Sequence, residues 1–161
     1  MKCRGGGIGY LCSVYVVCYN NVMQNSKHKQ GTVSELIASS YFIRNDYKVS
    51  KPINDFSEYD LIIDKDILSR VQVKTAYWDN SKKRYLVSLV TSHIRGNGRK
   101  PNKKYEKNSF DLLCAVQKET NSIYLIPIKE ILGRRSITLY PLEKLKTVSK
   151  RFEDFEKYKV E

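Results

Sequence analysis

The sequence predicts an α/β fold in which one mixed β-sheet is flanked by helices. Three observations lead to this prediction. An apolar stripe at helical spacing lies between Gly31 and Asn45. Short strand-like segments, separated by turn-forming residues, follow from Tyr47 to Tyr140, and helical spacing returns after Pro141. Because helical segments precede and follow the strands, we expect helices against the faces of the sheet.

The first helix and a β-hairpin are the clearest of the predicted elements. The capping box that begins at Thr32 and ends at Glu35 predicts the start of the helix. Residues 59–63 and 70–76 predict a hairpin around the acidic turn at 64–66. The other predictions are strands at 47–50, 84–90, 110–116, 123–127 and 136–140, a short helix at 128–132, a polar loop at 92–108 and a helical C-terminal region at 142–158.

Length and charge limit the class of protein. A chain of 161 residues is long enough for one hydrophobic core and too short for two independent domains. The formal net charge of +12 favours a polyanionic partner. Ribosomal and membrane-surface proteins are similarly basic, so the net charge alone does not identify the function.

The cysteines and histidines do not form a zinc motif. No Cys-x-x-Cys pair is present, and the chain has only two histidines. A structural zinc site needs four nitrogen or sulfur ligands at short paired spacings. We therefore expect a reduced, intracellular protein, in the cytoplasm, the nucleoid or an organelle that encodes it.

Residues 1–22 differ from the rest of the chain. Their apolar run, Ile8–Cys18, is too short to span a bilayer as a helix, and no small-x-small cleavage site follows it. We interpret the segment as an N-terminal extension, or as a start codon placed too early with Met23 the true initiator. A secretory signal peptide is the less favoured alternative, and no membrane partner is expected. Residues 23–161 are then one domain, with a core at about 31–132.

The chemistry is concentrated in the predicted hairpin. Strand alternation places Gln72 and Lys74 on one face and Val71 and Val73 on the other. Hydrolysis of a phosphodiester requires a cation against the phosphate and an activated water. Asp60, the Gln72 amide oxygen and the Val73 backbone carbonyl are candidate ligands for Mg²⁺, which prefers oxygen donors.

Two further groups complete this candidate site. Lys74 can position or deprotonate the water and hold the phosphate. Glu35 can join the acidic cluster if the first helix packs over the strand ends. Each residue also has a plainer interpretation. Glu35 would serve a capping box in any case, Asp60 could merely flank a hairpin, and Gln72 and Lys74 could form a solvated strand face. The combination favours a site.

Glu35, Tyr59-Asp60 and Val71-Gln72-Val73-Lys74 resemble the core of PD-(D/E)XK nucleases, most closely the group I intron-encoded branch, which has glutamine at the third motif position. The resemblance covers about 31–132. It implies a restriction-endonuclease-like core, double-strand cleavage dependent on Mg²⁺ with Mn²⁺ able to substitute, and a homodimer or homotetramer on a roughly symmetric site. The implied catalytic set is Glu35, Asp60, Gln72 and Lys74.

Two positions depart from the family pattern. Tyr59 stands where proline is usual, at a position that is permissive in such nucleases. Gln72 removes one negative charge compared with glutamate, so we expect a lower metal affinity. A degenerate, inactive copy of the fold would show the same loss.

Basic residues outside the catalytic set are candidates for contacts with DNA. A loop rich in lysine and arginine can follow the phosphate backbone or enter a groove. A solvated charge run explains the same pattern equally well. The candidates are Lys82, Lys83, Arg84, Arg95, Arg99, Lys100, Lys103, Lys104 and Lys107.

The sequence therefore predicts a Mg²⁺-dependent DNA endonuclease, with a site-specific intron-homing enzyme as the first hypothesis and double-stranded DNA as its partner. A Holliday-junction resolvase on the same core is the rival enzyme. A catalytically inactive DNA-binding module is the alternative from another class.

Overall fold

The structure, a computed structural model, describes residues 26–54, 57–90, 94–95, 98–99, 104–141 and 155–160. At 26–27, 94–95 and 98–99 it describes the backbone alone. The predicted N-terminal extension, residues 1–22, lies outside this part of the chain. Among the described residues, no helix combines the length and apolar character needed to cross a bilayer.

Helix α2 spans Ser26–Arg44 and begins six residues before Thr32, the predicted N-cap. The prediction that Glu35 occupies a capping box at the helix N-terminus was therefore wrong. Thr32 lies inside the helix, where its hydroxyl donates to the His28 carbonyl at 3.2 Å instead of capping a free amide. The helix ends where Asp46 adopts a left-handed conformation with φ of 64°.

Eight of the described strands form one mixed sheet, as predicted. Its main path is β1-β2-β3-β7-β8-β10, while β4 pairs with β3 and β9 pairs with β4. Only the β3–β7 pair is parallel among these pairs. The strands are β1 Lys48–Ser50, β2 Leu61–Asp64, β3 Ser69–Asp79, β4 Arg84–Ser88, β7 Leu112–Gln117, β8 Ile123–Pro127, β9 Ser136–Leu139 and β10 Lys159–Val160.

Strand β3 has two different partners along one of its edges. Its first half pairs with β2, up to the Leu61–Val71 pair, and its second half pairs with β4, from the Ala76–Val87 pair onward. The opposite edge pairs continuously with β7. Within the described part of the chain, residues 72–75 therefore have no strand partner on the first edge. This stretch is called the β3 gap below.

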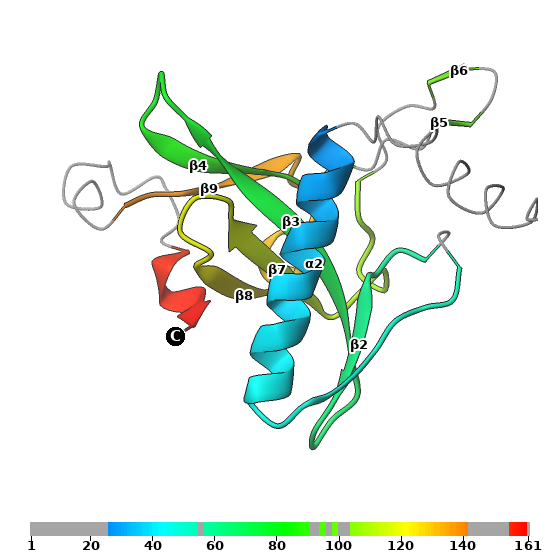
Figure 1. The fold of residues 1–161 in the computed structure, drawn as a ribbon. Coiled ribbons are helices and arrows are strands. Elements are labelled where there is room, and N and C mark those ends of the chain that lie inside the picture. Colours follow the sequence, from blue (N-terminus) through cyan, green and yellow to red (C-terminus); the bar gives the residue numbers. More distant parts are fainter. Residues whose placement is uncertain are drawn as a thin grey trace, which may run out of the picture.

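Helix α2 covers one face of the sheet and crosses β3 and β7 (Figure 1). Val71 and Val73 belong to the core layer beneath the helix, whereas Ala76, which shares its strand face with Gln72 and Lys74, belongs to the layer on the opposite face, as the predicted alternation requires. Burial raises the pKa of the Cys114 thiol in this layer to about 12. The full layer is Ala38, Phe42, Leu61, Ile63, Val71, Val73, Cys114, Val116 and Ile123.

The opposite face carries a second core layer, which includes Phe110, Leu113 and Tyr124. The predicted short helix at 128–132 is a 3-10 turn, η1, at Ile128–Glu130. Phe155, directly before the 3-10 turn η2 at Glu156–Tyr158, is also buried in this layer.

Two sequence predictions about the chain beyond the core need correction. The end of the predicted C-terminal helical region is η2 followed by β10, and Val160 pairs with Ile123 at the sheet edge. Residues 142–154 of that region lie outside the described residues. The predicted loop at 92–108 contains a short hairpin, formed by β5 Ile94–Arg95 and β6 Gly98–Arg99.

The packing of α2 on the sheet predicts a large difference between adjacent helix positions. Phe42 is fully buried, whereas Ile43 is 61% exposed. Phe42→Ala should lower the free energy of unfolding by about 3–5 kcal/mol through lost burial and a cavity. Ile43→Ala should change it by about 0.5 kcal/mol or less. Urea denaturation measures both, and equal effects would contradict this docking of α2.

Candidate active site

Asp60 directly precedes β2 in the chain and lies along the edge of β3. Its backbone N–H donates to the Val71 carbonyl at 2.9 Å, which continues the β2–β3 ladder by one bond. Its carboxylate Oδ2 then accepts the Val73 N–H at 2.7 Å and a hydrogen bond from the Gln72 side-chain amide. The Asp60 side chain thus takes the place of a strand partner at the β3 gap.

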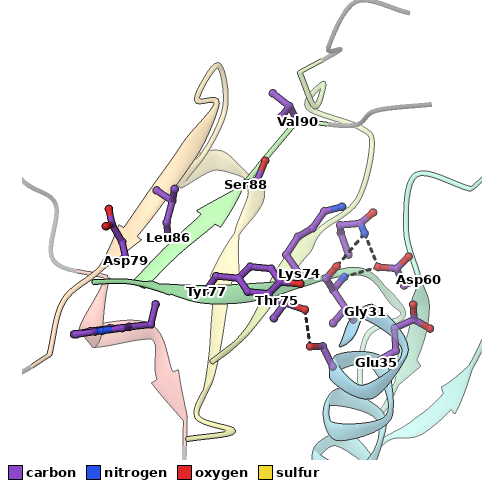
Figure 2. Close-up of a pocket in the computed structure, with 14 residues that line it drawn as sticks. Gly31, Glu35, Asp60, Lys74, Thr75, Tyr77, Asp79, Leu86, Ser88 and Val90 are labelled. Atoms are coloured by element: carbon purple, nitrogen blue, oxygen red, sulfur yellow. Dashed lines mark hydrogen bonds between the residues drawn. The ribbon is translucent and has the colours of Figure 1, made fainter. Parts of the chain in front are cut away.

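Helix α2 brings Glu35 to the same place. The hydroxyls of Ser34 and Thr75 are hydrogen-bonded at 2.7 Å, which fixes this turn of the helix against the β3 gap. Figure 2 shows Glu35 and Asp60 on the same side of β3, with Lys74 projecting from the strand beside them. The four residues of the predicted catalytic set are therefore brought together.

The electrostatics of the site are those of charged groups withdrawn from water. Burial raises the pKa of Asp60, and the nearby Glu35 adds to this effect, while the Val73 N–H and Lys74 oppose it. Burial lowers the pKa of Lys74, and the two carboxylates oppose that shift. Lys74 thus stabilises the charged form of Asp60, and the two carboxylates stabilise the charged form of Lys74.

These groups line one side of a cleft of about 460 Å³. The cleft continues from the β3 gap along β3 and β4, past Tyr77, Leu86 and Ser88 (Figure 2). The surface can therefore hold more than a single phosphate, because it extends well beyond Asp60 and Lys74.

The oxygen donors fit a hard divalent cation. The Gln72 amide nitrogen contacts both Asp60 Oδ2 and, at 3.2 Å, the Val73 carbonyl oxygen. Asp60 Oδ2 and the Val73 carbonyl oxygen, which would both bind a cation, thus already point at the NH₂ group of the Gln72 amide. If this amide turned by half a turn, its own oxygen would face the same point. Mg²⁺ takes such carboxylate, amide and carbonyl oxygens.

Among the described residues, no group of three or more histidine, cysteine or acidic side chains lies close enough together to hold a metal. The further donors at the β3 gap are the Gln72 amide and the Val73 carbonyl. A cation here would therefore depend on these two neutral donors, with Asp60 and Glu35 as the charged ligands.

The candidate DNA contacts lie in two other regions. Lys82 and Lys83 are exposed in the β3–β4 turn, and Arg84 lies against Asp79, with 3.6 Å between Nε and Oδ2. Lys104 and Lys107 are exposed before β7. The side chains of Arg95 and Arg99 in the β5–β6 hairpin are outside the described part, as are residues 100 and 103.

Sequence reasoning missed two residues at the site. Lys51 donates to Glu35 Oε2 at 2.8 Å, and Lys74 Nζ lies 6.0 Å from the centre of the Tyr105 ring. Arg70 positions the segment that carries Tyr105, because its guanidinium binds the Asn108 carbonyl and the Asp111 carboxylate. No local motif marks either residue, since both contacts join segments distant in sequence.

A mixed sheet with carboxylates, an amide and a lysine gathered at a gap in one strand edge is the plan of a restriction-endonuclease-like nuclease. The family comparison agrees with this class. Residues 25–161 match the PD-(D/E)XK endonuclease family, and the chain belongs to that family. No curated protein matches the chain.

Two solved structures are similar to this chain to different degrees. A bacterial homing endonuclease, I-Ssp6803I, is similar with a TM-score of 0.72 and 24% identity, over 84% of this chain and 89% of that chain. MepB has a TM-score of 0.45 and 16% identity, over 78% of this chain and 95% of that chain. The first likeness confirms the restriction-endonuclease-like fold.

The raised pKa of Asp60 predicts a pH dependence of stability. The folded protein holds the Asp60 proton to higher pH than the unfolded chain, whose aspartates titrate at about 3.9. Ionisation therefore destabilises the fold as pH rises through the window between the two pKa values. Without metal, Asp60→Asn should become the more stable protein as pH rises from about 4 to neutrality.

Asp111 supplies a control of opposite sign. Hydrogen bonds from Arg70 lower its pKa, so its contribution is present at neutral pH and is lost as pH falls through the folded pKa. Asp111→Asn should be less stable than the wild type at neutral pH, and the difference should shrink in acid. Denaturant titrations across pH in a chelator measure both variants. A parallel pH response of the two would contradict the assigned environments.

Proposed function

We propose that this protein is a divalent-metal-dependent endonuclease that cleaves double-stranded DNA, with Mg²⁺ as the cofactor and Mn²⁺ as a substitute. The observation that carries the proposal is the convergence of Glu35, Asp60, Gln72 and Lys74 at the β3 gap. Membership of the PD-(D/E)XK endonuclease family supports it.

The proposed roles follow from the chemistry of each group. Asp60, Glu35, the Gln72 amide oxygen and the Val73 carbonyl would hold the cation, which would supply positive charge against the scissile phosphate and activate water as a Lewis acid. Lys74 lies close enough to Asp60 and Glu35 to interact with both electrostatically. The proposed role of the Lys74 ammonium is to orient the attacking water and to bind an oxygen of the scissile phosphate.

We further infer a site-specific, intron-homing enzyme that acts as a homodimer or homotetramer on a roughly symmetric site. The Gln72-x-Lys74 pattern and the fold shared with a bacterial homing endonuclease support this choice. Cleavage of both strands also requires either two active sites or the reorientation of a single one. A symmetric oligomer provides two active sites. Exposed Lys82, Lys83, Lys104 and Lys107 would contact the phosphate backbone.

Plasmid cleavage tests the proposed activity. Lys74→Ala should reduce the rate of cleavage in Mg²⁺ by roughly 10²- to 10⁴-fold, because the water and the phosphate lose their cationic partner. Lys118→Ala, an exposed lysine at the far end of β7, is the control and should retain full activity. A Lys74→Ala protein as active as the wild type would refute the assignment.

Choice of substrate separates homing from junction resolution. A resolvase would prefer a synthetic four-way junction over every linear duplex, whereas a homing enzyme would cut one linear site. An inactive DNA-binding module would bind in a salt-sensitive manner without cleavage in Mg²⁺ or Mn²⁺.

The neutral Gln72 predicts how the site responds to an added charge. Gln72→Glu places a second carboxylate against Asp60 in a buried position, so the metal-free protein should be less stable than the wild type. The added charge should lower the Mg²⁺ concentration that gives half of the maximal thermal shift. Melting curves over a Mg²⁺ series measure both effects. A weaker response to Mg²⁺ than in the wild type would remove Gln72 from the ligand set.

A further inference from the structure

We propose that Lys51 forms a second phosphate-binding subsite, which holds the DNA strand next to the scissile phosphate on the far side of Glu35 and Asp60. This inference rests on the proposed nuclease function and extends it to a residue outside the catalytic set. Lys51 lies in the loop between β1 and β2, directly after Ser50.

The subsite is a separate cleft that shares a wall with the larger one. Its volume is about 280 Å³, and Glu35 and Asp60 line both clefts. Lys74 lies on the side of the larger cleft and Lys51 on the side of the smaller one. A strand whose scissile phosphate lies between Asp60 and Lys74 therefore reaches the smaller cleft by continuing past the two carboxylates.

Charge explains why a lysine is needed at this point. The carboxylates repel any phosphate that passes them, so the path of the strand requires a cation beyond the acidic pair. Lys51 is near enough to Asp60 to lower its pKa, in addition to its 2.8 Å contact with Glu35. An ammonium has three N–H donors, and the Glu35 contact uses one.

The remaining lining is suited to a phosphodiester. Ser57 donates to Asn54 Oδ1 at 3.0 Å, which orients the Asn54 amide in the cleft. Tyr59 adds a phenol, and the Arg70 guanidinium lies 6.0 Å from the centre of its ring. Hydroxyl, amide and ammonium groups are the usual partners of phosphate oxygens in protein–DNA complexes.

A purely structural ion pair is the simpler account of Lys51, and the chain offers a matched comparison. Lys48, at the start of β1, pairs with Asp64 at 4.0 Å and lines neither cleft. Half of the Lys51 side chain is exposed, so its pair with Glu35 stabilises the fold by only about 0–1 kcal/mol. Lys48 is the more exposed of the two, at 87% against 48%, and only Lys51 contacts Glu35 and lines the smaller cleft.

The salt dependence of DNA binding tests the subsite. A plasmid-derived duplex is titrated with protein in Ca²⁺, under conditions in which the duplex remains intact. Lys51→Met should reduce the slope of log K against log salt by about 0.9, the value of one phosphate contact, while Lys48→Met should leave the slope unchanged. Equal slopes for wild type and Lys51→Met would overturn the proposal.

A second comparison separates phosphate binding from an effect through Glu35. In a Glu35→Gln background, Lys51→Met should still reduce the slope, because the phosphate contact does not require the carboxylate. If the reduction disappears in that background, Lys51 acts only by orienting Glu35 and the subsite is refuted.

Cleavage assays keep this result distinct from the nuclease proposal. A wild type that cleaves, with an unchanged slope in Lys51→Met, would retain the endonuclease and remove the subsite. A wild type that never cleaves, with a reduced slope in Lys51→Met, would retain a phosphate contact at Lys51 and remove the nuclease. In an active enzyme, Lys51→Met should raise KM more than it lowers kcat, and Lys51→Arg should restore KM.

Discussion

The gap in the edge of β3 is the constraint on which the rest of the site depends. A strand that leaves one partner before reaching the next exposes backbone groups that need hydrogen bonds. Here the Asp60 carboxylate accepts the Val73 N–H, and the Gln72 amide donates to the Val73 carbonyl. The Asp60 carboxylate and the Val73 carbonyl are also oxygens proposed to hold a cation, and the fold itself positions them before any metal binds. The Gln72 amide faces them with its nitrogen and would have to turn to present its own oxygen.

The same gap determines where the charges lie. Lys74 and Asp60 are both largely withdrawn from water, and burial shifts the pKa of each toward its neutral form. Ser34 and Thr75 hold α2 close enough for Glu35 to add a second carboxylate. Two acids and two lysines, Lys74 and Lys51, then surround one point. The two negative and two positive charges of this cluster balance one another. A divalent cation and a phosphate would add charges of opposite sign to each other, so the balance would largely persist.

Local patterns were sufficient to predict the parts of this arrangement that depend on neighbouring residues. Alternation identified the face of β3 that carries Gln72 and Lys74, and turn residues identified the β2–β3 hairpin. The helix start was missed because Gly31 and the Thr32–Glu35 pattern resemble a boundary, whereas nothing in 26–30 interrupts a helix. Lys51 and Tyr105 reach the site through tertiary contacts, which sequence spacing does not encode.

The neutral Gln72 does not by itself indicate an inactive copy of the fold. A module that only binds DNA has no use for two carboxylates at its cleft, because they repel phosphate. A neutral asparagine oxygen could accept the Val73 N–H equally well, whereas the raised pKa of Asp60 predicts that its charge destabilises the metal-free fold at neutral pH. Both features become favourable once a divalent cation lies between the carboxylates and the substrate. The arrangement therefore favours the proposed catalysis over binding alone, and the proposed neutral oxygen donor Gln72 would limit the negative charge of an already crowded site.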